Sequence, residues 1–90
     1  MPSYEDFEIF PASEIYQLYD LNKDILLECK NKNIDKFNEI FIECIINNDV
    51  KLVRLYLSEL NIDPNIIINI RNKNINFIDG GKLIAMMFEH

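Results

Sequence analysis

The feature that most constrains the fold is a segment that is apolar on almost every side. Residues 35–47 place one set of apolar side chains on a single helical face at three- and four-residue spacing, while Ile42 and Ile46 fall on the other side. A helix of this kind is covered on both sides, so we expect it at the centre of the domain. The residues of the main face are Phe37, Ile40, Phe41, Cys44 and Ile45.

A second helix is expected directly after the central one. Asn48 and Asp49 suit a tight turn followed by a helix N-cap. Residues 50–60 then carry a new apolar stripe at helical spacing, made of Leu52, Val53, Tyr56, Leu57 and Leu60. Two antiparallel helices joined by two or three residues form a helical hairpin, which is therefore predicted here.

The chain before the hairpin also has helical spacing. Ser13 is a suitable N-cap for a helix that begins at the next residue. Asn22 either divides this stretch into two shorter helices or lies within one, and the polar run 31–33 ends it. Residues 1–11 are short, acidic and aromatic, and we interpret them as an ordered arm that packs on the body. A flexible tail is the alternative.

The apolar period falls from about 3.6 residues to two after Pro64. Residues 66–70 and 75–78 are β-branched or aromatic runs on either side of the polar link 71–74. Alternating runs around a short polar link are typical of a β-hairpin. We therefore expect a β-hairpin near the C-terminal end, which we call the finger.

Together these patterns predict one domain over residues 1–90, of mainly α class, with antiparallel helical hairpins and one β-hairpin. Its expected parts are the arm at 1–11, a helical region at 12–63, the β-hairpin finger at 64–81 and the start of a helix at 82–90.

The net charge is −6, and it is unevenly distributed. Residues 1–28 hold seven acids and one base, whereas the rest of the chain is balanced. Phosphate-backbone binding depends on clustered Lys and Arg, so we do not expect a nucleic-acid partner. Asp20, Asp24 and Glu28 are spaced four apart and would share one helical face. A solvated acidic face is the simplest interpretation, and a docking surface for a basic partner is the sharper one.

The composition favours a cytoplasmic, intracellular protein. There is no run of 18 apolar residues, so no membrane partner is expected. The acidic N-terminus lacks the basic and apolar regions of a secretory or transit signal. Cys29 and Cys44 do not make a disulfide framework, so free thiols are expected, with a bridge as the minority case.

Catalysis is poorly supported by the residue inventory. The only histidine is His90, the last residue, so no Ser–His or Cys–His pair is expected. Cys29 and Cys44 are too few for a four-ligand zinc site. Residues 80–82 (Gly-Gly-Lys) lack the longer phosphate-binding loop. We therefore expect no enzyme activity, no metal and no cofactor.

Residues 40–65 resemble an ankyrin repeat. The resemblance rests on residues 44–45 in the first helix, 48–49 at the inter-helix turn, the second-helix run 50–57, and residues 62–65 at the exit towards a projecting finger. It implies a protein-binding scaffold with no chemistry of its own. It also implies that the chain is either the N-terminal capping part of a longer array or a one-repeat remnant.

The finger is the expected contact surface for a partner. Strand alternation turns Ile67 and Ile78 outward, with Arg71 and Lys73 at the tip. Tyr56 on the adjoining helix completes the candidate protein-binding set. A second copy could pair through the hairpin edge, giving a homodimer. Packing of the finger against the protein's own N-terminal arm is the alternative.

The function that the sequence favours is a non-catalytic intracellular protein–protein interaction module, ankyrin-like in character. The alternative is a small acidic helical regulator or inhibitor of viral or mobile-element type. That protein would act through its acidic N-terminal third.

Overall fold

The computed structural model of the protein describes residues 4–66 and residue 68. In this part of the chain the fold is mainly helical, as the sequence predicts, and it contains no strand. The helices are α1 (Tyr4–Ile9), α2 (Ala12–Leu18), α3 (Lys23–Lys32), α4 (Ile34–Ile46) and α5 (Val50–Ser58).

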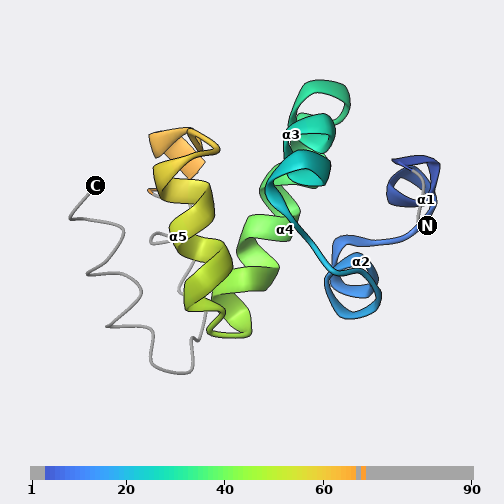
Figure 1. The fold of residues 1–90 in the computed structure, drawn as a ribbon, viewed down its shortest axis with the longest axis horizontal. Helices are drawn as coiled ribbons and strands as arrows, with labels where there is room; N and C mark the ends of the chain where they lie inside the picture. The colour runs from blue at the N-terminus through green and yellow to red at the C-terminus, as the bar shows by residue number, and fades with distance from the viewer. Residues whose placement is uncertain (1–3, 67, 69–90) are drawn as a thin grey trace.

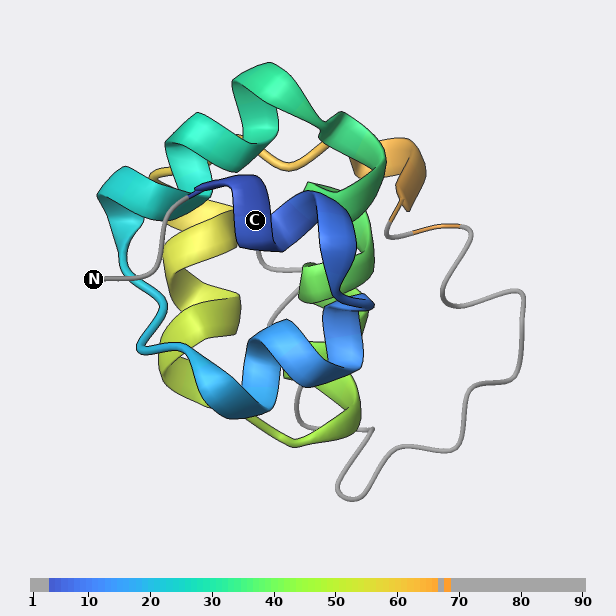
Figure 2. The same ribbon diagram turned by 90° about the vertical axis from the view of Figure 1, so that its right-hand side faces the viewer.

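Helix α4 is the centre of the bundle, which confirms the interpretation of its all-round apolar pattern. It packs against α2, α3 and α5, while α1 packs against α3. In Figure 1, α5 lies on one side of α4, and α1 and α2 lie on the other. Figure 2 shows α1 crossing between α3 and α2. The five residues of the main face of α4 are all completely buried, because each side of this face meets another helix.

Helices α4 and α5 form the predicted hairpin. Asn48 adopts a positive φ of 54°, which reverses the chain, and the backbone N–H of Asp49 donates to the Cys44 carbonyl at 2.8 Å. The Asp49 side chain then accepts from the N–H of Leu52 at 3.1 Å and caps α5. The turn and the cap are those expected from the sequence. The helix ends at Ser58, before the predicted end at residue 60.

The segment expected to be an arm contains the helix α1, and the helix expected after it is α2. Helix α1 buries Phe7, whose ring lies 5.6 Å from that of Tyr19, so this segment packs on the body as predicted. Helix α2 begins at Ala12, and the predicted Ser13 cap is wrong. Pro11 is extended, and its carbonyl accepts from the N–H groups of residues 14 and 15, so the backbone starts the helix without a side-chain cap.

Asn22 and Asn33 divide the middle of the chain into separate helices. The helical path stops at Tyr19, and the Asn22 side chain restarts it by accepting from the N–H of Ile25 at 3.0 Å. Asn33 both ends α3 and begins α4. Its N–H donates to the Cys29 carbonyl at 2.7 Å, and its side chain accepts from the N–H of Lys36 at 3.1 Å. Of the two alternatives for Asn22, the break into two helices is therefore correct.

Two lysines tie distant segments to this framework. Lys36 donates to the Phe10 carbonyl at 2.9 Å and so joins α4 to the connection between α1 and α2. Lys30 donates to the Leu60 carbonyl at 2.7 Å, which joins α3 to the chain that follows α5. Leu60 is buried there because Asn61, with a φ of 49°, turns the chain back after the helix.

The predicted β-hairpin is not seen in the described residues. Ile66 and Ile68 are helical, so the expected strand is wrong at these two positions. Asp63 provides the local reason, because its carbonyl accepts from the N–H of Ile66 and its side chain accepts from that of Asn65, both at 2.9 Å. Pro64 suits the first position of such a helical turn. The rest of the finger and residues 82–90 lie outside the described residues.

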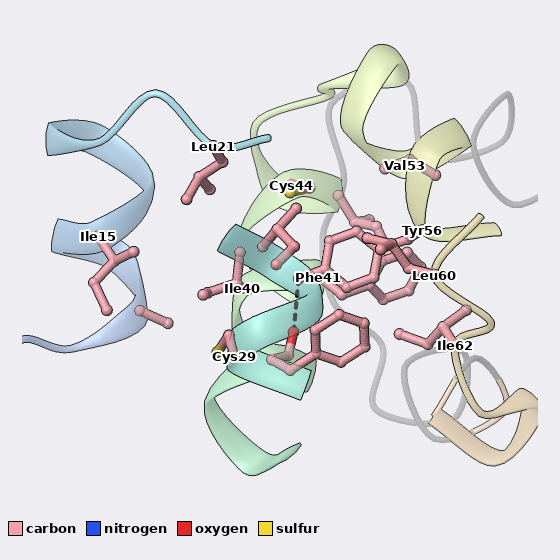
Figure 3. Close-up of a cluster of buried hydrophobic side chains, with 14 of the residues drawn as sticks. Ile15, Leu21, Cys29, Ile40, Phe41, Cys44, Val53, Tyr56, Leu60 and Ile62 are labelled. Carbon is pink, nitrogen blue, oxygen red and sulfur yellow. Dashed lines mark hydrogen bonds between the residues drawn. The ribbon is translucent and has the colours of Figure 1, made fainter. Parts of the chain in front are cut away.

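The core is organised around Tyr56. Its ring lies 4.6 Å from that of Phe37 and 4.9 Å from that of Phe41. The hydroxyl, which is completely buried, donates to the Phe37 carbonyl at 2.8 Å, the bond drawn in Figure 3. A buried donor needs such a partner, so this contact fixes how α5 sits on α4.

We expect Tyr56→Phe to lower the free energy of unfolding by about 1–2 kcal/mol, because it removes a buried hydrogen bond while keeping the ring. Urea unfolding followed by circular dichroism measures this change. Tyr16→Phe is the comparison, since it removes a hydroxyl that is only partly buried and that donates to the Asp49 carboxylate outside the core. Equal midpoints for the native protein and Tyr56→Phe would contradict the assignment.

The turn residue Asn48 gives a second stability prediction. Its side-chain oxygen is buried without a hydrogen-bond partner in the described part of the chain, and its φ is positive. Asn48→Gly removes both costs, so we expect it to be at least as stable as the native protein. Asn48→Ala places alanine at a positive φ, which alanine tolerates less well than asparagine, so we expect it to be about 1 kcal/mol less stable than the glycine variant. The ranking is measured from thermal unfolding midpoints, and an alanine variant more stable than the glycine variant would refute it.

Candidate functional site

Most of the predicted contact surface cannot be placed. Ile67, Ile78, Arg71 and Lys73 lie outside the described residues, so their expected role in binding a protein stays a prediction. The fifth residue of that set is Tyr56, and its predicted place on the contact surface is wrong. It is completely buried and bonded to the Phe37 carbonyl, so it stabilises the core and is not on the surface.

The acidic residues are exposed, but they do not share one helical face as predicted. Asp24 and Glu28 lie on α3, whereas Asp20 precedes that helix in the loop between α2 and α3. The break at Asn22 causes this separation. Glu28 is paired with Lys32 at 2.9 Å, so part of the expected acidic row is already neutralised.

The described surface instead has a groove beside α5 that the sequence reasoning missed. It lies between α5 and the α2–α3 loop, which crosses in front of α4 in Figure 1, and its volume is about 490 Å³. A second hollow of about 270 Å³ adjoins it and shares the residues Asp20, Leu21, Lys51 and Leu52. The groove brings together residues that are about thirty positions apart in the chain, so helical periodicity alone could not reveal it.

Leucines form the apolar part of this groove. Leu52 and Leu55 are half-buried on α5 and pack against the edge of the core. Leu21 lies opposite them, and its side chain is only 9% exposed because it points from the loop towards the core, as Figure 3 shows. The groove therefore has a fixed apolar lining that the core itself supports.

Polar contacts hold the walls of the groove in place. Lys23 at the start of α3 pairs with Glu59 after α5 at 3.3 Å, which links the loop side to the helix side. Tyr16 on α2 donates to the Asp49 carboxylate at 2.7 Å in the adjoining hollow. Burial, and then this bond to Asp49, raise the pKa of Tyr16 well above its ordinary value, so the phenol stays protonated and keeps donating.

The helix side of the groove carries two exposed cations. Lys51 and Arg54 lie three residues apart on one face of α5, and neither forms an ion pair within the described residues. The first turn of α5 contains no acidic residue. The positive end of the helix dipole adds to the charge of Lys51, and the N-cap carboxylate of Asp49 offsets part of it. Asp20 is the acidic group on the opposite side.

The two cysteines are buried and free, as predicted. Burial raises the pKa of the Cys29 thiol to about 11, although nearby Lys36 partly opposes the shift. Burial also raises the pKa of Cys44, and Asp49 adds to the effect. A thiol is nucleophilic as the thiolate, so these environments give neither cysteine the character of an activated nucleophile.

The described residues offer no group of three or more His, Cys, Asp or Glu side chains that could hold a metal ion. Within the same residues, no helix combines the length and the apolar character needed to cross a membrane.

Comparisons with protein-family models, with curated proteins and with solved structures find no match to this chain. The candidate site therefore rests on the geometry described above.

Because the two thiols are buried, we expect the free energy of unfolding to depend on pH in the alkaline range. The pKa of Cys29 is 9 when exposed and about 11 when folded. Below pH 9 both states are protonated and the full stability is present, and between pH 9 and 11 only the unfolded state loses its proton. We expect urea midpoints to fall across this window. Cys29→Ala should reduce the fall, and a native midpoint that stays constant through it would contradict the prediction.

Proposed function

We propose that this chain is a non-catalytic protein-binding module of the intracellular, cytoplasmic kind, built on the helical hairpin α4–α5 and ankyrin-like in residues 40–65. The observation that carries the proposal is the groove beside α5. Half-buried Leu52 and Leu55 line it, and it is bordered by Lys51 and Arg54, which form no ion pair with any residue that the structure describes. An apolar centre with a charged rim is the usual anatomy of a protein interface.

The contacts of the groove support a binding role over a catalytic one. Its titratable groups are surface carboxylates and cations with no nucleophile–base pair among them. The buried thiols of Cys29 and Cys44 lie outside its lining. The lining of the groove thus holds no nucleophile that a neighbouring base could activate. It offers shape, apolar area and charge, the properties by which one protein recognises another.

The predicted finger is retained as a second contact in this proposal. In an ankyrin-like arrangement the finger beyond residue 68 would project next to the hairpin, with Ile78 facing outward. Ile67 stands between the helical residues 66 and 68, so its role as a contact no longer rests on strand alternation. Ile67→Lys with Ile78→Lys would then weaken partner capture in addition to any effect of the groove. A second copy bound through the finger edge would show itself as a dimer in sedimentation analysis.

A bulky residue in the groove tests the proposal. Ser58 lines the groove and is exposed, so Ser58→Trp fills it without changing the core. Gln17→Trp is the matched control, since Gln17 is exposed on α2 away from the groove. In quantitative affinity capture from cell extract, we expect Ser58→Trp to lose about 90% of a partner that Gln17→Trp retains, a loss equal to about 1.4 kcal/mol of binding free energy.

The same assay tests the alternative function, an acidic regulator or inhibitor of viral or mobile-element type. Asp24→Asn with Glu28→Gln neutralises the part of the acidic third on α3, and neither residue lines the groove. Capture that survives Ser58→Trp but is lost with this double variant would overturn the groove proposal. It would transfer the binding role to the acidic surface, where added salt should also weaken binding.

A further inference from the structure

We infer that the groove beside α5 takes an acidic amphipathic helical segment of the partner protein. This inference rests on the proposed function and specifies the chemistry of the partner. Leucine-type side chains of the segment would cover the apolar lining, and its carboxylates would pair with the cations of α5.

The apolar requirement follows from the burial of the lining. Leu52 and Leu55 lie three residues apart on α5 and are only half-covered by the core, whereas Leu21 across the groove is almost fully covered. A partner that covers the remaining area of the two leucines gains the free energy of removing that apolar surface from water. A helix with apolar residues three and four positions apart presents a ridge that can fill such a groove.

The charge requirement follows from two cations that form no ion pair in the described part of the chain. Lys51 and Arg54 are three residues apart on one helical face, where like charges repel each other. The other lysines of the described surface have partners there, and Lys30 donates to the Leu60 carbonyl at 2.7 Å. Lys23, Lys32 and Lys36 each have a carboxylate within 4.0 Å. Within the described residues the two cations of the groove have no carboxylate partner, so we expect them to pair with an incoming carboxylate.

The position of Lys51 strengthens this argument. It is the second residue of α5, where a helix favours an acidic side chain because the backbone there is partly positive. The capping carboxylate of Asp49 is already bonded to Tyr16 and to the N–H of Leu52. A residue that lowers helix stability, as a lysine does at this position, is expected where its side chain has a role in function. A partner's carboxylate over Lys51 would pair with its ammonium group and add to the negative charge that Asp49 already places at this end of the helix.

The opposite wall sets the orientation of the segment. Glu59 is paired with Lys23, but Asp20 forms no ion pair within the described residues. A carboxylate over Asp20 would be repelled, so the acidic side of the segment must face α5 while its other side faces the loop. The net charge of −6 also disfavours nucleic acid as the occupant, because a phosphate backbone would approach an acidic protein.

The experiment uses two synthetic helical peptides with the same leucine ridge. One carries glutamates beside the ridge, and the other carries lysines at the same positions. Binding to the full chain is measured by fluorescence anisotropy at low and high salt. We expect the glutamate peptide to bind, the lysine peptide to bind at least ten-fold more weakly, and the preference to shrink at high salt.

Single substitutions then place the peptide in the groove. Arg54→Glu should weaken binding of the glutamate peptide by about ten-fold, and Lys51→Glu should do the same while leaving the Tm equal or higher. A weaker complex with a more stable protein separates lost recognition from misfolding. Asp20→Asn should strengthen binding. Lys32→Glu is the matched control, since it makes the same charge change on α3 outside the groove.

Several outcomes would overturn the inference. The first two are equal binding of the two peptides, and a loss of peptide binding in Lys32→Glu as large as in Arg54→Glu. The third is binding of poly(U) RNA to the native chain that Arg54→Glu abolishes. The fourth is a dimer of the free chain that Arg54→Glu dissociates. Failure of the peptides while capture remains sensitive to Ser58→Trp would reject the acidic chemistry and leave the proposed function in place. Loss of that sensitivity as well would reject both.

Discussion

The burial of α4 between three other helices is the constraint on which the rest of the structure depends. Its main face is completely covered, and α5 is locked onto it by the stacking of Tyr56 with Phe37 and Phe41 and by the hydroxyl bond to the Phe37 carbonyl. One face of α5 is thereby committed to the core. The opposite face, with Lys51 and Arg54, is left at the surface, where the groove forms. The packing of one side of this helix thus determines what its other side can offer to a partner.

Local chemistry predicted most of the helical framework. The all-round apolar pattern of residues 35–47 identified the central helix, and Asp49 was correctly identified as the cap of α5. The pattern failed where the backbone replaced a side chain, as at Pro11, whose carbonyl starts α2 in place of the expected Ser13 cap. It also failed at Ile66, where the cap formed by Asp63 favours a helical turn over a strand despite the β-branched run.

The candidate site was less accessible to sequence reasoning. The groove depends on bringing the α2–α3 loop against α5, and no residue spacing records that contact. One signal was present, because Lys51 in the first turn of α5 opposes the usual preference for acidic side chains within that turn, where the nearest acid is the N-cap Asp49. Tyr56 shows the converse error. Its place in the apolar stripe of α5 already indicated burial, and an aromatic residue with a polar end was nevertheless assigned to the surface.

The double role of Asn33 limits where residues can be inserted into or deleted from this chain. Because one residue ends α3 and begins α4, the two helices have no spare linker between them. An insertion there would rotate α3 relative to the core and misplace Cys29 and Leu26, which are fully buried. The α2–α3 loop is different, since Leu21 anchors it while Asp20 and Asn22 beside it are exposed. We therefore expect this loop to tolerate insertions and deletions better than the Asn33 junction, so that the wall of the groove can vary while α3 and α4 keep their positions.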